Sequence, residues 1–511
     1  MKYKRVISAL LIAIMICTLG IPCFAADGQP FKTGNAGVER FRIPALITLK
    51  SGKLLAAADA RYGHGTDSPA NIDTVVSYSD DNGQSWSKLK KVNNFTDVDK
   101  ENREYVVEAS ASFIDVALQQ DSSGKVYLIT DACPAFMGSP NAKKSGSGLI
   151  DGKIAVCDKT TTDKMESTAL DKEHYPYYVG TFNNGYAPIK KFDDGKVYKK
   201  YYVDTEYKLY TLNGDEYKKV YVPVIGADGN LTEKKTQANL FYAHSPVKIY
   251  PAFYIWLRTS TDEGKTWSKP KILNKDIKSE GFTGICPGKG FLYNADGTER
   301  VIFTVYDNNK GQEYTSTIYT ENGGKTWSRG ERATKVGFSG KSSESQIVEL
   351  YDGILRMYSR NTAGHISYTD STDGGKTWGK YKLDMSLKYT SNCMVSFINY
   401  SGEIDGHKAI IAAYPSAKKR KLGTVKIGLV SENNRIDWKY SYNVTDDLND
   451  LTYVYSCLSE LPDGRIGLLY ESQAAEISYK SYDVEELMRH EKHPNAIEKV
   501  FYVIISWFSK V

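Results

Sequence analysis

The chain has 511 residues, of which 25% are charged and 41% hydrophobic. This composition excludes a small disulfide-stabilised domain, a coiled coil and a disordered chain, and the lack of an internal apolar run of about 18 residues excludes a protein that spans a membrane several times. The formal net charge of +5 gives no reason to expect a nucleic acid as partner. Tyr outnumbers Phe by 38 to 17, which favours β structure.

Residues 1–25 have the pattern of a signal peptide. Lys2, Lys4 and Arg5 precede an apolar stretch at 6–19, and the segment ends in a small residue. We therefore expect the segment to be removed and the protein to be secreted or held at the cell surface. The mature chain is expected to have no membrane span.

One octapeptide recurs along the chain. It follows the pattern Ser/Thr-x-Asp/Asn-x-Gly-x-Ser/Thr-Trp and occupies residues 79–86, 260–267, 320–327 and 371–378, with a degraded copy at 431–438. The Asp or Asn can hydrogen-bond to nearby backbone and the glycine can adopt positive φ, so each copy is expected to be a tight turn fixed by a buried tryptophan. Three copies contain Gly-Lys-Thr, but each lacks the first glycine of a phosphate-binding loop.

A second repeated unit is a turn followed by an apolar strand. It occurs six times, at 51–59, 123–131, 296–307, 352–360, 405–415 and 463–471. Trp267, Trp327, Trp378 and Trp438 follow one another at intervals of about 50 to 60 residues, which is the length of a four-stranded unit. The six units predict an all-β fold, a six-bladed β-propeller.

One interval is too long for this period. Between Trp86 and Trp267 the chain has about one period more than the blades need, and hairpin signals occur there at Asn213-Gly214 and Asp228-Gly229. These signals predict a small β-rich inserted domain. We expect the first blades in 30–150, the inserted domain in 151–240, the remaining blades in 241–480, and a C-terminal helix and apolar tail in 481–511.

The six apolar strands end in or near charged residues, which are Arg61, Asp131, Asp307, Arg360, Arg420 and Glu471. Equivalent strands of a propeller converge on one mouth, so these side chains are expected to line a common pocket. Three of the six are arginines, and clustered guanidinium groups repel one another unless an anion lies among them. The predicted ligand is therefore a carboxylate or a similar anion.

The motif Phe41-Arg42-Ile43-Pro44, together with four octapeptides, resembles the bacterial sialidases, or exo-α-neuraminidases, over about residues 35–480. The catalytic domain of that family is a six-bladed propeller. The resemblance implies a glycoside hydrolase that releases terminal sialic acid from glycoproteins, glycolipids or oligosaccharides. We expect a monomer that requires no cofactor, and a structural calcium ion is left open.

The resemblance also implies which residues bind the substrate. Arg42, Arg360 and Arg420 match the three arginines that hold the sialic acid carboxylate. Arg61 resembles an additional arginine that contacts the ring hydroxyls of the sugar, and Asp115 resembles a residue of the acetamido pocket.

Three further matches are catalytic. Asp67 resembles the general acid/base, with Asp59 and Asp73 as alternatives by position, and Glu344 resembles the partner of a nucleophile, Tyr455. A carboxylate nucleophile would be repelled by the carboxylate on the anomeric carbon of the substrate, whereas a neutral phenol would not. Because a free tyrosine has a pKa near ~10, the phenol needs a base. The implied reaction proceeds with retention through a covalent tyrosyl intermediate.

Three other functions remain open at this point. The covalent intermediate could react with the sugar's own hydroxyl, as in an intramolecular trans-sialidase that gives anhydro-sialic acid. The chain could be a non-catalytic Asp-box propeller that binds glycans, but such a protein has no need for Arg42, Glu344 and Tyr455 together. A propeller glycosidase for neutral polysaccharides would use paired carboxylates in place of an arginine cluster.

Overall fold

The computed structural model describes residues 27–489 apart from 64, 101–104, 143–144, 159–168, 279–280, 296, 310–311, 335–339, 388–389, 446–450 and 473–475. The predicted signal peptide at 1–25 and the apolar tail lie outside the described residues. Among the described residues, three short α-helices occur, at Ser139–Ala142 (α2), Asn274–Ile277 (α3) and Val484–Arg489 (α4), and 3-10 turns lie at Asn35–Gly37 and Tyr351–Gly353. No helix in this part of the chain is long and apolar enough to cross a membrane.

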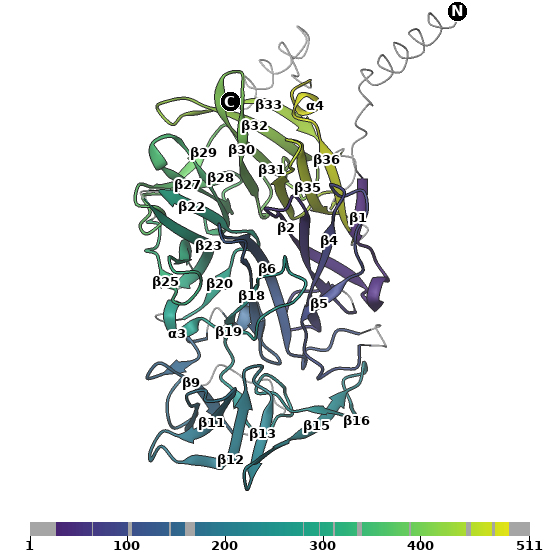
Figure 1. The fold of residues 1–511 in the computed structure, drawn as a ribbon, viewed down its shortest axis with the longest axis vertical. Helices are drawn as coiled ribbons and strands as arrows, with labels where there is room; N and C mark the ends of the chain where they lie inside the picture. The colour runs from purple at the N-terminus through teal and green to yellow at the C-terminus, as the bar shows by residue number, and fades with distance from the viewer. Residues whose placement is uncertain are drawn as a thin grey trace, which may run out of the picture.

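Six antiparallel blades form a ring (Figure 1), which confirms the predicted six-bladed β-propeller. The first blade contains β2 (Arg40–Thr48), β3 (Leu54–Arg61), β4 (Ile72–Ser79) and β5 (Lys90–Asn93), and the second contains β6 (Ser112–Gln120), β7 (Val126–Cys133), β18 (Tyr254–Ser260) and β19 (Lys271–Ile272). The third contains β20 (Thr283–Ile285), β22 (Phe291–Ala295), β23 (Thr298–Asn309), β24 (Gln312–Thr320) and β25 (Ser328–Arg329). A short strand, β21 (Gly288–Lys289), pairs in parallel with β6.

The fourth blade contains β26 (Ser342–Glu349), β27 (Leu355–Asn361), β28 (Ile366–Ser371) and β29 (Lys382–Asp384), and the fifth contains β30 (Ser396–Ile404), β31 (His407–Pro415), β32 (Gly423–Val430) and β33 (Ile436–Asn443). The sixth contains β34 (Ser456–Glu460), β35 (Ile466–Glu471) and β36 (Ile477–Tyr482). Its outer strand is β1 (Asp27–Phe31), which pairs with β36. A strand from the start of the described chain therefore completes the last blade and closes the ring.

The hydrophobic core lies between neighbouring blades. Leu55 of the first blade and Leu128 of the second belong to one cluster, and similar clusters lie between each following pair of blades. A further cluster, which includes Phe41 and Leu469, joins the sixth blade to the first. All eight residues of β3 are buried, because neighbouring blades cover both faces of the strand.

Each octapeptide is a turn closed by its own side chains. In the second copy, Ser260 Oγ donates to Asp262 Oδ1 (2.7 Å) and accepts from the Gly264 N–H (2.8 Å). Asp262 also accepts from the N–H and the hydroxyl of Thr266 (2.8 and 2.6 Å). Gly264 has a φ of 82°, which only glycine adopts readily. The tryptophan that follows packs against an interblade cluster, so each turn fixes one blade to its neighbour.

Asp262→Ala should lower the free energy of unfolding by about 1–2 kcal/mol, because the backbone and side-chain donors of the turn lose their acceptor. Thermal or denaturant unfolding of the purified chain measures this loss. Asp215→Ala is the matched control, since Asp215 lies in an exposed hairpin turn and no side-chain hydrogen bond to it occurs among the described residues. An equal loss of stability in both variants would contradict a stabilising role for the octapeptide turn.

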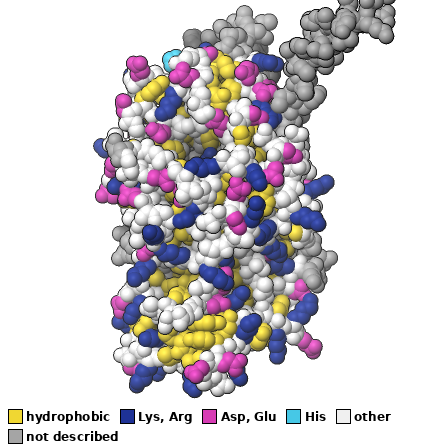
Figure 2. Space-filling model, in the orientation of Figure 1, with side chains coloured by type: hydrophobic (Ala, Val, Ile, Leu, Met, Phe, Trp, Pro, Cys, Tyr) yellow, Lys and Arg dark blue, Asp and Glu magenta, His cyan; other side chains and the backbone are white. Residues whose placement is uncertain are grey.

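An inserted sheet leaves the second blade between β7 and β18. Its strands are β8 (Leu149–Ile150), β9 (Lys153–Cys157), β10 (Tyr177–Val179), β11 (Tyr186–Lys191), β12 (Val197–Asp204), β13 (Leu209–Asn213), β14 (Glu216–Lys219) and β17 (Lys248–Ile249). A hairpin of β15 (Tyr221–Ile225) and β16 (Leu231–Gln237) lies beside it. The insertion forms one end of the molecule in Figure 1, and Figure 2 shows hydrophobic side chains gathered over β11, β12 and β13.

Candidate active site

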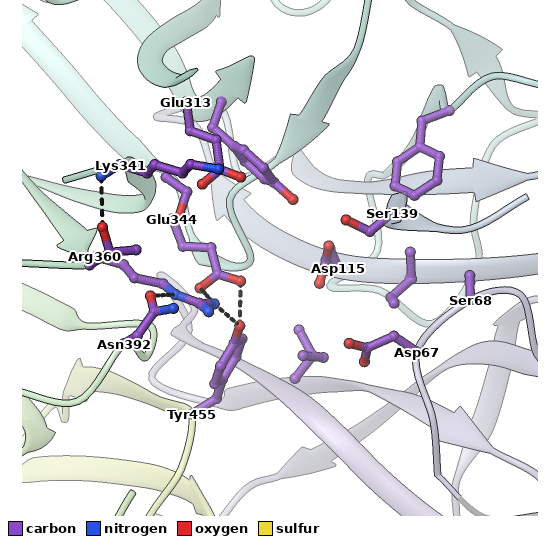
Figure 3. Close-up of a pocket in the computed structure, with 16 residues that line it drawn as sticks. Asp67, Ser68, Asp115, Ser139, Glu313, Lys341, Glu344, Arg360, Asn392 and Tyr455 are labelled. Atoms are coloured by element: carbon purple, nitrogen blue, oxygen red, sulfur yellow. Dashed lines mark hydrogen bonds and ion pairs between the residues drawn. The ribbon is translucent and has the colours of Figure 1, made fainter. Parts of the chain in front are cut away.

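A cavity of about 440 Å³ lies where the inner strands of several blades meet. Its lining comprises Ile43, Asp67, Ser68, Ile114, Asp115, Ser139, Phe253, Tyr306, Glu313, Lys341, Ser343, Glu344, Arg360, Thr362, Asn392 and Tyr455. Figure 3 shows that Asp67 and Asp115 lie on one side of this cavity and that Glu344, Arg360 and Tyr455 lie on the other. The cavity therefore brings together residues from opposite ends of the sequence.

Tyr455, Glu344 and Arg360 form one hydrogen-bonded group (Figure 3). The Tyr455 hydroxyl donates to Glu344 Oε1, and Arg360 Nη1 donates to both Glu344 Oε2 and the Tyr455 oxygen, each at 2.7 Å. Arg360 Nε is fixed by Asn392 Oδ1 (2.7 Å). Burial, followed by the charge of Glu344, raises the pKa of Tyr455 well above its ordinary value, although Arg360 opposes the shift. The phenol is therefore neutral and lies beside a carboxylate that can accept its proton.

Two more arginines contact the Tyr455 ring. The guanidinium carbon of Arg42 lies 5.5 Å from the ring centroid and that of Arg420 lies 5.6 Å from it. Arg42 Nε donates to Glu471 Oε2 (3.2 Å), and Arg420 Nη2 donates to the Asn392 carbonyl (3.0 Å). The side chain of Arg420 is partly buried, whereas its neighbours Lys418 and Lys419 are exposed. The structure thus places Arg42, Arg360 and Arg420 around one tyrosine.

Asp67 lies across the cavity from Tyr455 and contacts two arginines. Its Oδ1 atom accepts from Arg61 Nη1 (2.6 Å) and Arg42 Nη1 (3.2 Å), and 61% of its side chain is exposed. Desolvation acts to raise the pKa of Asp67, but the charges of Arg61, Arg42 and Arg420 outweigh it and lower the pKa. An anion that occupied Arg42 would weaken this effect and favour the protonated acid.

Arg61 lies behind Asp67 and is not among the residues that line the cavity. Its side chain is fully buried and also donates to Asp59 Oδ2 (2.9 Å) and to the Gly65 carbonyl (3.0 Å). The predicted contact of Arg61 with the sugar stays a prediction. In the structure, Arg61 fixes the loop that carries Asp67.

The two positional alternatives to Asp67 lie elsewhere. Asp59 is fully buried under Arg61, and burial raises its pKa to about 7. Asp73 is also fully buried and pairs with Lys91 (3.1 Å) and Lys100. Of these three carboxyl groups, only Asp67 lines the cavity.

Asp115 lies on the cavity wall in a strained backbone conformation. Its φ is 65°, at an irregularity in the pairing of β6 with β7 between Ile114 and Ala117. Burial, together with the charges of Asp59, Glu344 and other carboxylates, raises the pKa of Asp115 well above its ordinary value. A carboxyl group that is neutral in this way can donate a hydrogen bond to a ligand.

The same backbone irregularity occurs in three inner strands. The pairing of β2 with β3 shifts between Arg42 and Ala45, where Ile43 has a φ of 60°, and the pairing of β26 with β27 shifts around Glu344. A β-bulge changes the direction of the side chains next to it. Together with the bulge at Asp115, these irregularities lie at the residues that face the cavity.

Several cavity residues were missed by the sequence reasoning. Asn392 holds two of the arginines, and no motif marks it. Ser139 and Phe253 lie on the two segments that lead into and out of the insertion, so the insertion begins and ends at the cavity wall. Glu471, named above at a strand end, lies outside the cavity lining and acts through Arg42, whose Nε donates to it.

The expectation that all six strand ends line one pocket was wrong. Of these residues, only Arg360 is part of the cavity lining. Asp131 is fully buried and accepts from the Ile285 N–H (2.9 Å), and Asp307 is fully buried and binds Arg329 and Arg332, each at 2.6 Å. Asp131 and Asp307 lie on strands that are second in their blades, and both side chains are held by neighbouring protein groups. Arg360 is also on a second strand, β27, but its side chain reaches Glu344 and Tyr455 at the cavity.

No group of three or more His, Cys, Asp or Glu side chains suited to a metal ion occurs within the described part of the chain. The cavity presents Arg360 beside a carboxylate-bound tyrosine, and Arg42 and Arg420 lie near the ring of the same tyrosine. Such an arrangement can bind an anion and can generate a phenolate nucleophile.

Comparison with known proteins identifies the class of this propeller. Residues 205–468 match the model of a BNR repeat-like domain, and residues 77–88 match that of a BNR/Asp-box repeat. The chain is 33% identical over 484 residues to an anhydrosialidase of Macrobdella decora, and 33% identical over 479 residues to sialidase B of Streptococcus pneumoniae. These matches cover 89% of this chain and 60% and 64% of the two relatives, so the chain spans less than two thirds of their length.

A solved structure is similar over almost its full length. The intramolecular trans-sialidase of Ruminococcus gnavus, in complex with oseltamivir carboxylate, has a TM-score of 0.80 and 32% sequence identity, with 91% of this chain and 99% of that chain covered. The matches and the fold define an Asp-box propeller. The chain belongs to the sialidase family.

Proposed function

We propose that this chain is an exo-sialidase that releases terminal sialic acid from glycoproteins, glycolipids or oligosaccharides with retention of configuration. The observation that carries this proposal is the hydrogen-bonded group of Tyr455, Glu344 and Arg360, which faces Asp67 across a cavity. The signal-peptide pattern at 1–25 supports export of the enzyme, which would bring it to such glycans outside the cell.

The arginines select the substrate. Arg42, Arg360 and Arg420 lie close enough to Tyr455 to bind one carboxylate beside it. A guanidinium group binds a carboxylate with two parallel hydrogen bonds, which fixes its orientation as well as its position. The anomeric carbon that bears this carboxylate would then lie within reach of the Tyr455 oxygen.

The first step forms a covalent intermediate. The Tyr455 oxygen attacks the anomeric carbon while Glu344 accepts the phenolic proton, and the glycosidic bond breaks as Asp67 donates a proton to the leaving oxygen. A neutral phenol approaches this centre without the repulsion that the substrate carboxylate would exert on a carboxylate nucleophile. Arg360 stabilises the phenolate character that develops, because it donates directly to the same oxygen.

The second step reverses these proton transfers. Asp67, now ionised, accepts a proton from water, which attacks the anomeric carbon, and the Tyr455 oxygen leaves and recovers its proton from Glu344. Two inversions at one carbon give net retention.

An intramolecular trans-sialidase is a second candidate. The similarity to the Macrobdella decora anhydrosialidase and to the Ruminococcus gnavus intramolecular trans-sialidase favours it. The two functions share every step up to the covalent intermediate and differ only in whether water or the sugar's own hydroxyl attacks it.

Proton NMR of a reaction with 3′-sialyllactose distinguishes these functions. Lactose together with free sialic acid, first in the α configuration, is the result expected for the hydrolase. An anhydro sugar in place of the free acid would establish the second candidate. Binding without release of lactose would contradict both and would favour a non-catalytic glycan-binding propeller.

The pH dependence of catalysis should reveal the environment of Asp67. As a general acid Asp67 must be protonated, so activity falls when the pH rises through its pKa. This pKa is lowered in the free enzyme, and it should rise when the substrate carboxylate neutralises Arg42. Because kcat/KM reports the free enzyme and kcat reports the complex, the alkaline limb of kcat should lie at a higher pH than that of kcat/KM.

Steady-state kinetics of a fluorogenic sialoside across the pH range measures both limbs. The Asp67→Asn variant is the control, because it removes the titrating group with little change in volume. If the alkaline limbs of kcat and kcat/KM coincided, or if an alkaline limb persisted in Asp67→Asn, a group other than Asp67 would control the loss of activity at high pH.

A further inference from the structure

A second groove lies between the insertion and the second blade. It has a volume of about 510 Å³ and is formed by β9, β10 and the loop after β10 on one side and by β19 and α3 on the other. None of its lining residues belongs to the active-site cavity. The groove is therefore a separate surface, and the mechanism does not use it.

The lining of the groove is positively charged. Three lysines, Lys153, Lys190 and Lys275, line it, and none of the described residues in the lining is acidic. No ion pair to any of these lysines occurs within the part of the chain that the structure describes. The carboxylate of Asp151, on the turn before β9, is paired with Lys172 (2.8 Å), and the charges of Lys172 and Lys153 both lower its pKa.

Aromatic and apolar groups lie between the lysines. The Lys153 ammonium lies 4.1 Å from the centroid of the Tyr178 ring. This cation–π contact holds the ammonium at the groove and does not neutralise its charge. Phe182 is 38% exposed, and Leu149, Ile154, Val179 and Ile272 form the aliphatic part of the lining. The Lys275 side chain reaches across to the turn at Gly152, so both walls contribute charge.

We propose that this groove is a second binding site for sialylated oligosaccharides. Its lysines complement the carboxylate of the sugar, and the exposed Phe182 ring offers a flat apolar surface for the C–H face of a pyranose ring. Charge complementarity argues for an acidic ligand, and the apolar lining argues for a sugar over a fully polar polyanion. The choice of sialic acid among acidic sugars rests on the proposed function. Such a site would hold a multivalent glycan near the enzyme between catalytic events.

Binding to an immobilised polymer that bears 3′-sialyllactose tests the proposal. The measurement uses the full chain with Arg360→Ala. This substitution weakens binding of the sugar carboxylate in the active site, so that binding to the groove dominates. Adding Lys153→Ala, Lys190→Ala and Lys275→Ala should raise the Kd for the polymer about tenfold, since each exposed charge pair contributes a modest amount. A polymer that bears lactose alone should not bind.

The matched control is Lys218→Ala, Lys219→Ala and Lys235→Ala, which removes the same charge from exposed positions on the insertion. The proposal would be overturned if the groove substitutions left the Kd unchanged or if the control variant lost as much affinity. Equal binding of the lactose polymer would also overturn it. Competition by polygalacturonate as strong as that by the soluble sialylated polymer would overturn the choice of sialic acid. Turnover of a small sialoside by the unaltered chain is measured separately, and its absence would contradict the proposed function and not the groove.

Discussion

Tyr455→Phe should lower kcat for a fluorogenic sialoside by at least about 10³-fold, because the variant lacks the oxygen that forms the covalent bond. The substitution removes one oxygen atom and leaves the ring that both Arg42 and Arg420 contact. Binding of sialic acid should change less than kcat, since the arginines that hold the carboxylate remain. Steady-state kinetics combined with equilibrium binding of sialic acid separates these two effects.

Tyr453→Phe is the matched control for this variant. Tyr453 is fully buried two residues earlier in the chain, and its ring stacks on Tyr470 at 5.2 Å, outside the cavity lining. The control should retain nearly all activity. Near wild-type turnover in Tyr455→Phe, with its fold confirmed by circular dichroism, would mean that Tyr455 is not the nucleophile.

Arg360→Ala should lower kcat/KM by about 10²–10³-fold. Arg360 donates to Glu344, to Tyr455 and, through Nε, to Asn392, so its removal leaves a nearly buried Glu344 without its cation. Breaking one side of a buried ion pair typically costs about 3–5 kcal/mol. Separately from this cost in stability, loss of the guanidinium that is proposed to bind the substrate carboxylate should raise KM, and loss of the donor to the Tyr455 oxygen should lower kcat.

Arg356→Ala provides the comparison, because Arg356 lies on the same strand and makes two hydrogen bonds to Asp370 (2.7 and 2.9 Å). It removes a paired arginine from β27 without touching the cavity lining. Equal losses of kcat/KM in the two variants would point to a structural effect of the strand and would contradict a specific role for Arg360.

The fold could be predicted because its information is local and repeated. Each octapeptide closes its own turn through short-range hydrogen bonds, as Asp262 does with Ser260 and Thr266. The turn can therefore be recognised from eight consecutive residues. The spacing of the tryptophans then gives the size of a blade. The insertion was visible as an interruption of this spacing and as hairpin signals at 213–214 and 228–229.

The site is harder to predict because its residues meet only in three dimensions. Tyr455 and Glu344 are 111 positions apart, and no periodic pattern joins them. Their proposed roles came from the resemblance to a family. The bulges at Asp115 and Ile43, which both line the cavity, have these non-glycine residues at positive φ, and no motif in the sequence marks the bulges.

The error over the strand ends has a related origin. Alternation of charge and hydrophobicity shows where a strand ends, but it does not show whether that strand is first or second from the axis of the propeller. Asp307 satisfied the pattern and yet binds Arg329 and Arg332 inside the third blade. Arg360 lies on the equivalent second strand of the fourth blade and does line the cavity, so the pattern alone does not separate a structural charge from one that faces the cavity.

Covalent trapping tests the central claim most directly. A 3-fluorosialosyl fluoride should form the tyrosyl adduct and release it slowly, because fluorine at C3 destabilises the positive charge that develops when the intermediate breaks down. Intact-protein mass spectrometry and peptide mapping should find one sugar per chain, attached to Tyr455, and none in Tyr455→Phe. An adduct on Glu344 or Asp67, or no adduct on a chain that turns over sialosides, would contradict the proposed mechanism.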